Sequence, residues 1–68
     1  MVYEVMVTIV DSPTKIIGWG YLIKAENEIN AKIEALNMAK IKASKPRSRY
    51  KKCTFIVKEG NCIAKPNW

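Results

Sequence analysis

The segment from Lys40 to Lys52 reads KIKASKPRSRYKK, and its residue types point to the binding of phosphate groups. Seven of its thirteen residues are lysine or arginine, and none is acidic. Such side chains neutralise phosphates and release the counterions condensed on nucleic acid, which dominates non-specific affinity. Arg47 and Arg49 can also hold a phosphate with two hydrogen bonds or stack on a base, and Tyr50 adds an aromatic ring. The segment therefore predicts a polyanion site.

The net positive charge of the whole chain comes from this one segment. The chain has 12 basic and 6 acidic residues and a net charge of +6. Outside the segment 5 basic residues remain (12 − 7) against the same 6 acids, so the rest of the chain carries −1. Charge that is focused in this way attracts polyanions. The alternative, a hydrated helix end and loop without a partner, stays open.

One further lysine joins the candidate site through helical geometry. Lys32, Leu36 and Lys40 fall in one row of a helical wheel. Lys32 also lies within the predicted apolar arc of the helix, so its side chain either curls to the edge of that arc or extends the basic surface. The predicted binding residues are Lys32, Lys40, Lys42, Lys45, Arg47, Arg49, Lys51 and Lys52.

The sequence offers few groups for catalysis. It has no histidine, so the usual general base and metal ligand is missing. Cys53 and Cys62 have no histidine partner for a nucleophile or a zinc site, and the carboxylates show no pairing. Gly18 and Gly20 flank a tryptophan and do not open a helix as a phosphate loop would. We therefore expect a protein that is not an enzyme and has no metal, no cofactor and no small-molecule substrate.

The length of 68 residues predicts one domain, 1–68, with a modest core and surface binding rather than a deep cleft. Cys53 and Cys62 are not expected to reach the Cα separation of about 5.5 Å that a disulfide needs. Met1–Val10 lacks the basic leader of a signal peptide, and no apolar run approaches the ~18 residues of a membrane span. These features predict a cytoplasmic protein with reduced thiols and no membrane partner.

Two strands are expected first. Val2–Val10 and Ile16–Lys24 alternate between apolar and other residues, as half-buried strands do. Asp11–Lys15 has turn chemistry, so the two strands should form a hairpin with a five-residue connection. Trp19 is expected to anchor the core. The glycines on either side of it leave bare backbone on the opposite face, which could be a flat surface for a partner.

A helix follows over about Glu26 to Ala43, with acidic residues in its first turn and lysines in its last. Ile29, Ile33 and Leu36 have the spacing of a buried stripe, and alanines at 31, 35, 39 and 43 permit close packing. Pro46 ends the helical region.

Two shorter strands, Cys53–Lys58 and Cys62–Lys65, flank a tight turn at Gly60-Asn61. The sequence therefore predicts an α+β fold of order ββαββ. A right-handed crossover would give one antiparallel sheet of order 2-1-3-4 with the single helix on one face.

With this plan, the basic Lys40–Lys52 segment and no active-site residues, the chain resembles the small phage-encoded anti-CRISPR proteins, in particular the basic inhibitors of type I-F surveillance complexes. The resemblance covers the whole chain and rests on size, layout and charge. It implies a stoichiometric, non-enzymatic blocker in the host cytoplasm that docks on a CRISPR-Cas ribonucleoprotein complex and prevents target DNA from pairing with the guide. A basic patch would also hold DNA non-specifically.

Three hypotheses remain. The first is this protein-binding inhibitor, which predicts tight binding to one complex. The second is a free-standing module for the phosphate backbone of DNA or RNA, with weak sequence preference and strong salt dependence. The third is a structural or regulatory protein that pairs through a sheet edge.

Overall fold

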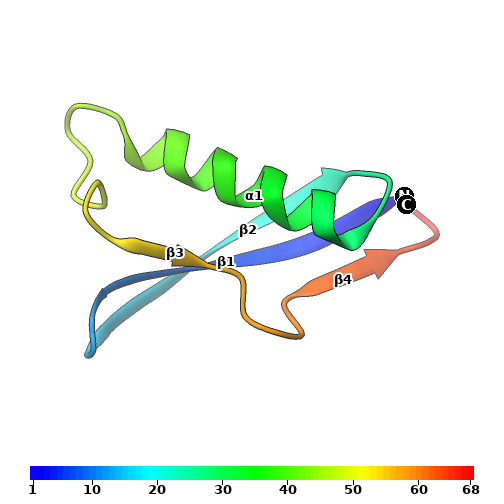
Figure 1. Ribbon diagram of the computed structural model, residues 1–68, viewed down its shortest axis with the longest axis horizontal. Helices are drawn as coiled ribbons and strands as arrows, with labels where there is room; N and C mark the ends of the chain where they lie inside the picture. Colours follow the sequence, from blue (N-terminus) through cyan, green and yellow to red (C-terminus); the bar gives the residue numbers. More distant parts are fainter.

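The computed structural model describes residues 1–68 as two long strands, one helix and two short strands. These elements are β1 (Val2–Ser12), β2 (Lys15–Lys24), α1 (Glu28–Ala43), β3 (Thr54–Ile56) and β4 (Cys62–Lys65). The strands form one antiparallel sheet, and α1 lies along one side of it (Figure 1). The expected α+β fold with a single helix is therefore confirmed.

β1 and β2 form a hairpin with a shorter connection than the sequence predicts. Only Pro13 and Thr14 join the two strands, rather than the five residues Asp11–Lys15. The pairing shifts by one residue at Asp11, which forms a bulge. No non-glycine residue has a positive φ, so the connection is not one of the mirror-image turns that match strand twist in two-residue hairpins. The bulge supplies extra twist instead.

The expected strand order 2-1-3-4 is wrong in its last position. β4 pairs with β1 rather than β3, so both short strands lie on the edge of β1 that faces away from β2. β3 pairs with Thr8–Val10 and β4 pairs with Val2–Val5, because the 11-residue β1 is long enough to pair with both. Between them Lys58 C=O accepts a 3.0 Å bond from Asn61 N–H, and Gly60 has a φ of 87°. The predicted turn therefore exists, but it interrupts one edge strand instead of closing a hairpin.

The helix packs on the sheet through a row of alanines. Ala31, Ala35, Ala39 and Ala43 are at most 2% exposed. The large apolar side chains come from the sheet, where Val5, Val7 and Ile9 are fully buried. Small residues on the helix let it approach these larger ones closely, which keeps the interior densely packed.

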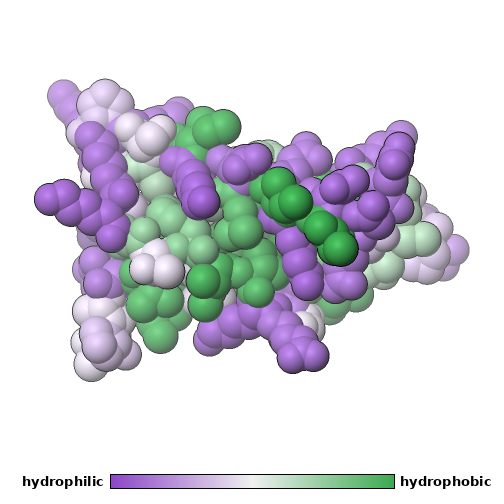
Figure 2. Space-filling view, viewed as in Figure 1, coloured by the Kyte–Doolittle hydropathy of each residue, from purple (hydrophilic) through white to green (hydrophobic).

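The predicted stripe of Ile29, Ile33 and Leu36 is wrong in two of its three members. Ile29 is 70% exposed and Ile33 is 51% exposed, while Leu36 packs at the border of the core. With about 100° per residue, Ile29 and Ile33 point roughly 100–140° away from the alanine row. Green surface along α1 in Figure 2 marks this exposed apolar side of the helix.

The helix ends are fixed by side chains of their own. Asn27 caps the N-terminus, since its Oδ1 accepts a 2.8 Å bond from Asn30 N–H. Ser44 caps the C-terminus, and its hydroxyl donates to Ile41 C=O at 2.7 Å. The first helical residue is therefore Glu28, two positions later than predicted.

The sheet has one covered and one open face. Alternation along β1 turns Val5, Val7 and Ile9 toward α1, whereas Met6 points to the other side. No element covers that other side, and Met6 is 40% exposed.

Candidate nucleic-acid interface

After the end of α1, the basic segment forms two consecutive turns. Ser48 N–H donates to Lys45 C=O at 2.9 Å, which closes a turn around Pro46. Cys53 N–H donates to Tyr50 C=O at 3.2 Å, which closes the second. The fixed φ of proline suits the second position of such a turn. The loop at the end of α1 therefore has local order, and hydrophilic side chains cover this end of the molecule (Figure 2).

This loop and the sheet enclose a shallow hollow of about 370 Å³. Four of the predicted basic residues line it together with two aromatic rings and a serine. The lining residues are Trp19, Lys42, Lys45, Arg47, Ser48, Arg49 and Tyr50. The hollow combines positive charge with aromatic surface, which is the combination that holds single strands and phosphate backbones.

The two aromatic residues that line the hollow, Trp19 and Tyr50, pack in a cluster with Phe55. The rings of Trp19 and Tyr50 meet edge to face, with centroids 5.3 Å apart and an interplanar angle of 88°. Phe55 on β3 lies 6.4 Å from Trp19 on centroids. Edge-to-face pairs of this kind are favourable beyond the area that they bury. The cluster therefore ties the loop to β2 and β3.

The charges around the hollow are not compensated inside the protein. The three ion pairs are Lys15–Asp11, Lys32–Glu28 and Lys65–Glu4. None involves a residue of the segment Lys40–Lys52. Of the segment's cations, Lys42 lies over the Trp19 ring at 4.4 Å, and Lys51 donates to Pro46 C=O at 3.3 Å. The remaining charge is available to an anion.

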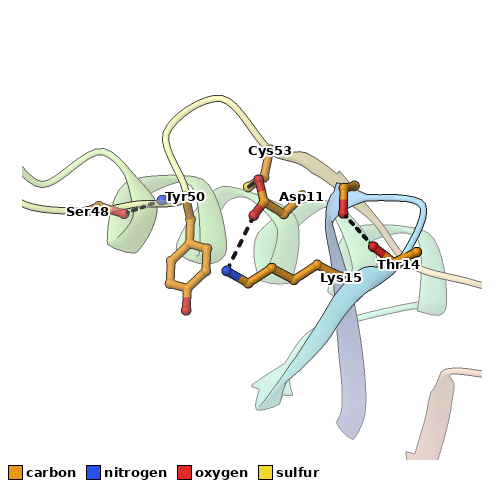
Figure 3. Close-up of polar contacts among 7 residues, drawn as sticks. Asp11, Thr14, Lys15, Ser48, Tyr50 and Cys53 are labelled. Carbon is orange, nitrogen blue, oxygen red and sulfur yellow. Dashed lines mark hydrogen bonds and ion pairs between the residues drawn. The ribbon is translucent and has the colours of Figure 1, made fainter.

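The far end of the loop is held by the hairpin tip. Cys53 Sγ donates to Asp11 Oδ1 at 3.7 Å, and Lys15 Nζ lies 3.7 Å from Asp11 Oδ2 (Figure 3). Tyr50 N–H donates to Ser48 Oγ at 3.1 Å within the loop (Figure 3). Partial burial, and then the Asp11 carboxylate, raise the pKa of the Cys53 thiol, which favours its neutral form as a donor. The bulge at Asp11 thus helps to position the basic loop.

The other predicted residues are distributed around this centre. Lys40 and Lys51 line a second hollow of about 300 Å³, next to Phe55. Lys52 is exposed in the second turn. Lys32 lies near the other end of α1 and is paired with Glu28 at 3.4 Å, so the structure does not bring it to the loop. Seven of the eight predicted residues thus share one end of the molecule.

The sequence prediction did not include Trp19 among the binding residues. Trp19 packs against the core as expected, but it is only half-buried, so one part of the ring remains to line the hollow. The only sequence signal for this role is the Gly-Trp-Gly stretch, and that stretch does not show which loop folds over it.

Comparison of the chain with protein-family models, with curated protein sequences and with solved structures gave no match. α1, the single helix, does not have the length and apolar character that crossing a membrane requires. No three side chains of the types that bind metal ions lie together.

Proposed function

We propose that this protein is a non-enzymatic binding protein that holds a nucleic-acid strand at the hollow between α1, β2 and the Lys40–Lys52 loop. The observation that carries the proposal is the set of cations around Trp19 and Tyr50 without acidic partners. Arginine and lysine neutralise phosphates, and the aromatic rings offer flat surface to a base or sugar. The function is recognition of a polyanion.

The shape of the site favours backbone contacts over base reading. The hollow is shallow and open, and its cations come from a loop and a helix end rather than from an element that fits a groove. Phosphate contacts fix position but carry no sequence information. Four such contacts would give a salt slope of about −3 to −4 on duplex DNA. Binding should therefore be sequence-tolerant and strongly dependent on salt.

The resemblance to inhibitors of type I-F surveillance complexes supplies a setting for this site. In that setting the protein acts in the host cytoplasm, docks on the CRISPR RNA-guided complex where target DNA enters and prevents pairing with the guide. The basic hollow would then contact guide or target phosphates. A free-standing module would use the same residues on nucleic acid alone.

The test is a charge reversal with a control of equal charge. Arg47→Glu/Arg49→Glu changes two exposed arginines that line the hollow. Lys24→Glu/Lys58→Glu changes two exposed lysines elsewhere, with the same change in net charge. Fluorescence anisotropy of labelled duplex DNA, single-stranded DNA and RNA is measured at several salt concentrations.

The expected result is a loss of binding at least tenfold larger in the arginine variant than in the lysine variant. Equal losses would show that only net charge matters, and the proposed site would then be rejected. Capture of a type I-F complex by the wild-type protein but not the arginine variant would support the inhibitor setting.

A further inference from the structure

The open face of the sheet carries a patch of large apolar side chains that no helix or strand covers, and Trp68 of the C-terminal tail borders it beside Gly20 and Leu22. We call this the open-face patch, and its members are Met6, Ile16, Leu22, Ile56 and Ile63. Their side chains are 39–55% exposed. Residues paired across neighbouring strands, and every second residue along one strand, lie on the same face of a sheet. Glu4 pairs with both Leu22 and Ile63, and Met6, two residues further along β1, pairs with Gly20, so these positions share one face. The patch therefore runs across β2, β1 and the edge formed by β3 and β4.

Two glycines of β2 leave room for the Met6 side chain at the centre of this face. A Cβ atom on Gly18 would lie 2.9 Å from Met6 Sδ, and one on Gly20 would lie 3.7 Å from Met6 Cε. The Met6 side chain therefore lies across bare backbone of β2. Methionine adapts its shape easily at contact surfaces, so this centre can fit closely against a partner surface.

We propose that the open-face patch is the interface of a homodimer in which the two sheets pack face to face. Sheets pack in this way about 10 Å apart, with the side chains of the two inner faces interlocking. A two-fold axis lets the same patch serve both copies. Each copy then gives its sheet a second covered face.

The area of the open face is sufficient for a modest dimer. Three strand positions about 4.8 Å apart, along the eleven residues of β1, give the whole face roughly 36 × 14 Å, or about 500 Å² per copy. Two copies bury about 1,000 Å² in total, which is where specific interfaces begin. The monomer also has little core, because 9 of its 68 residues are buried. Small domains with little core often gain stability by association.

The charge distribution permits a second copy as the occupant. On the open face Glu4 and Lys65 neutralise each other at 3.2 Å, so the face does not demand a partner of opposite charge. Four cations without an ion pair line the hollow with Trp19, which pairs with the buried Val7 and so belongs to the covered face. On the open face the lysine without an ion pair is Lys24, at the end of β2. Two open faces can therefore meet while the two basic hollows stay apart.

The experiment compares Leu22→Glu with Ile29→Glu. Leu22 is 55% exposed in the open-face patch, and Ile29 is 70% exposed on α1, so both variants place the same charge at an exposed apolar position. Ile63→Glu on β4 tests the patch a second time, and circular dichroism shows which variants are folded. Mass is measured by analytical ultracentrifugation from about 1 µM to about 1 mM, the range of weak interfaces.

We expect the wild-type mass to rise from 7.7 kDa to twice that value, and Ile29→Glu to behave in the same way. Leu22→Glu and Ile63→Glu should remain monomeric over the whole range. A wild-type protein that stays monomeric overturns the proposal. A dimer that survives in both patch variants indicates pairing through the free edge of β2, and loss of the dimer in Ile29→Glu alone indicates an interface on α1. Either result also overturns it.

Discussion

The ammonium group of Lys42 lies 4.4 Å from the centre of the Trp19 ring. This contact joins the last turn of α1 to the middle of β2, at the place where the basic loop begins. Since the Tyr50 ring meets the same ring edge to face, Trp19 contacts both the last turn of α1 and the basic loop. The aromatic cluster therefore belongs to the core and to the candidate site at once.

Lys42→Met should weaken nucleic-acid binding with only a small effect on the fold. Methionine keeps most of the apolar stem but loses the charge, and an exposed cation–π contact contributes about 0.5–1 kcal/mol. We expect the free energy of unfolding to fall by less than about 1 kcal/mol and the emission of Trp19 to change. Chemical denaturation and fluorescence are measured in a Trp68→Phe background, where Trp19 is the remaining tryptophan.

Lys42→Arg is the matched control for this change. It retains a cation over the ring, so its binding and emission should stay close to those of the parent. If the methionine variant binds as tightly as the arginine variant, Lys42 has only a structural role.

Ala35→Leu should destabilise the protein, because Ala35 is fully buried between α1 and the sheet. Extra carbon atoms in a close-packed interior cost about 1–3 kcal/mol. Ile33→Ala removes a larger side chain but one that is 51% exposed, so its cost should stay within about 0.5 kcal/mol. Urea denaturation of both variants is the measurement. A loss of several kcal/mol of unfolding free energy in Ile33→Ala, with little loss in Ala35→Leu, would show that the isoleucines and not the alanines are in the core.

Stability should decrease at alkaline pH because of three groups. Partial burial raises the pKa of Cys53 and Cys62 above 9.0 and that of Tyr21 above 10.0. In the unfolded chain these groups lose their protons at their ordinary pKa values, whereas in the folded chain they stay protonated to higher pH. Their contribution to the free energy of unfolding is therefore complete below about pH 9 and is lost as pH rises through the folded-state pKa values. Tyr21 contributes because its hydroxyl is buried without a hydrogen-bond partner.

Urea denaturation midpoints between neutral and alkaline pH measure this loss. Cys53→Ser/Cys62→Ser removes the two thiols, so its midpoint should fall less steeply above pH 9 than that of the wild type. Adding Tyr21→Phe should flatten the curve further. Parallel curves for the wild type and the triple variant would contradict the assignment.

Part of the fold could be predicted because it depends on short-range patterns. Alternation over Val2–Val10 and Ile16–Lys24 predicted two strands that the structure confirms with slightly different ends. The position of β4 could not be predicted in this way. The far edge of β3 or the free half of the β1 edge could have accepted it, and that choice depends on how far β1 extends and where the turn at Gly60 leaves the chain.

The helix shows why periodicity alone was insufficient. Both the isoleucines and the alanines of α1 repeat at helical spacing, and hydrophobicity favours the isoleucines. The sheet fills the space with its own large side chains, so the small alanines face it. The size of the side chains on the sheet decided whether the alanines or the isoleucines of α1 face it. The sequence of the helix alone does not contain that information.

The sequence by itself determined where the charge lies, since net charge and its focus in Lys40–Lys52 are properties of composition and order. It also determined that Pro46 ends the helix, because a proline restricts the residue before it. Only the tertiary structure decided that four of the cations surround Trp19, that Lys32 is paired elsewhere, and that an apolar face stays open. These relationships join residues far apart in the chain, and they follow from packing between layers rather than from local preference.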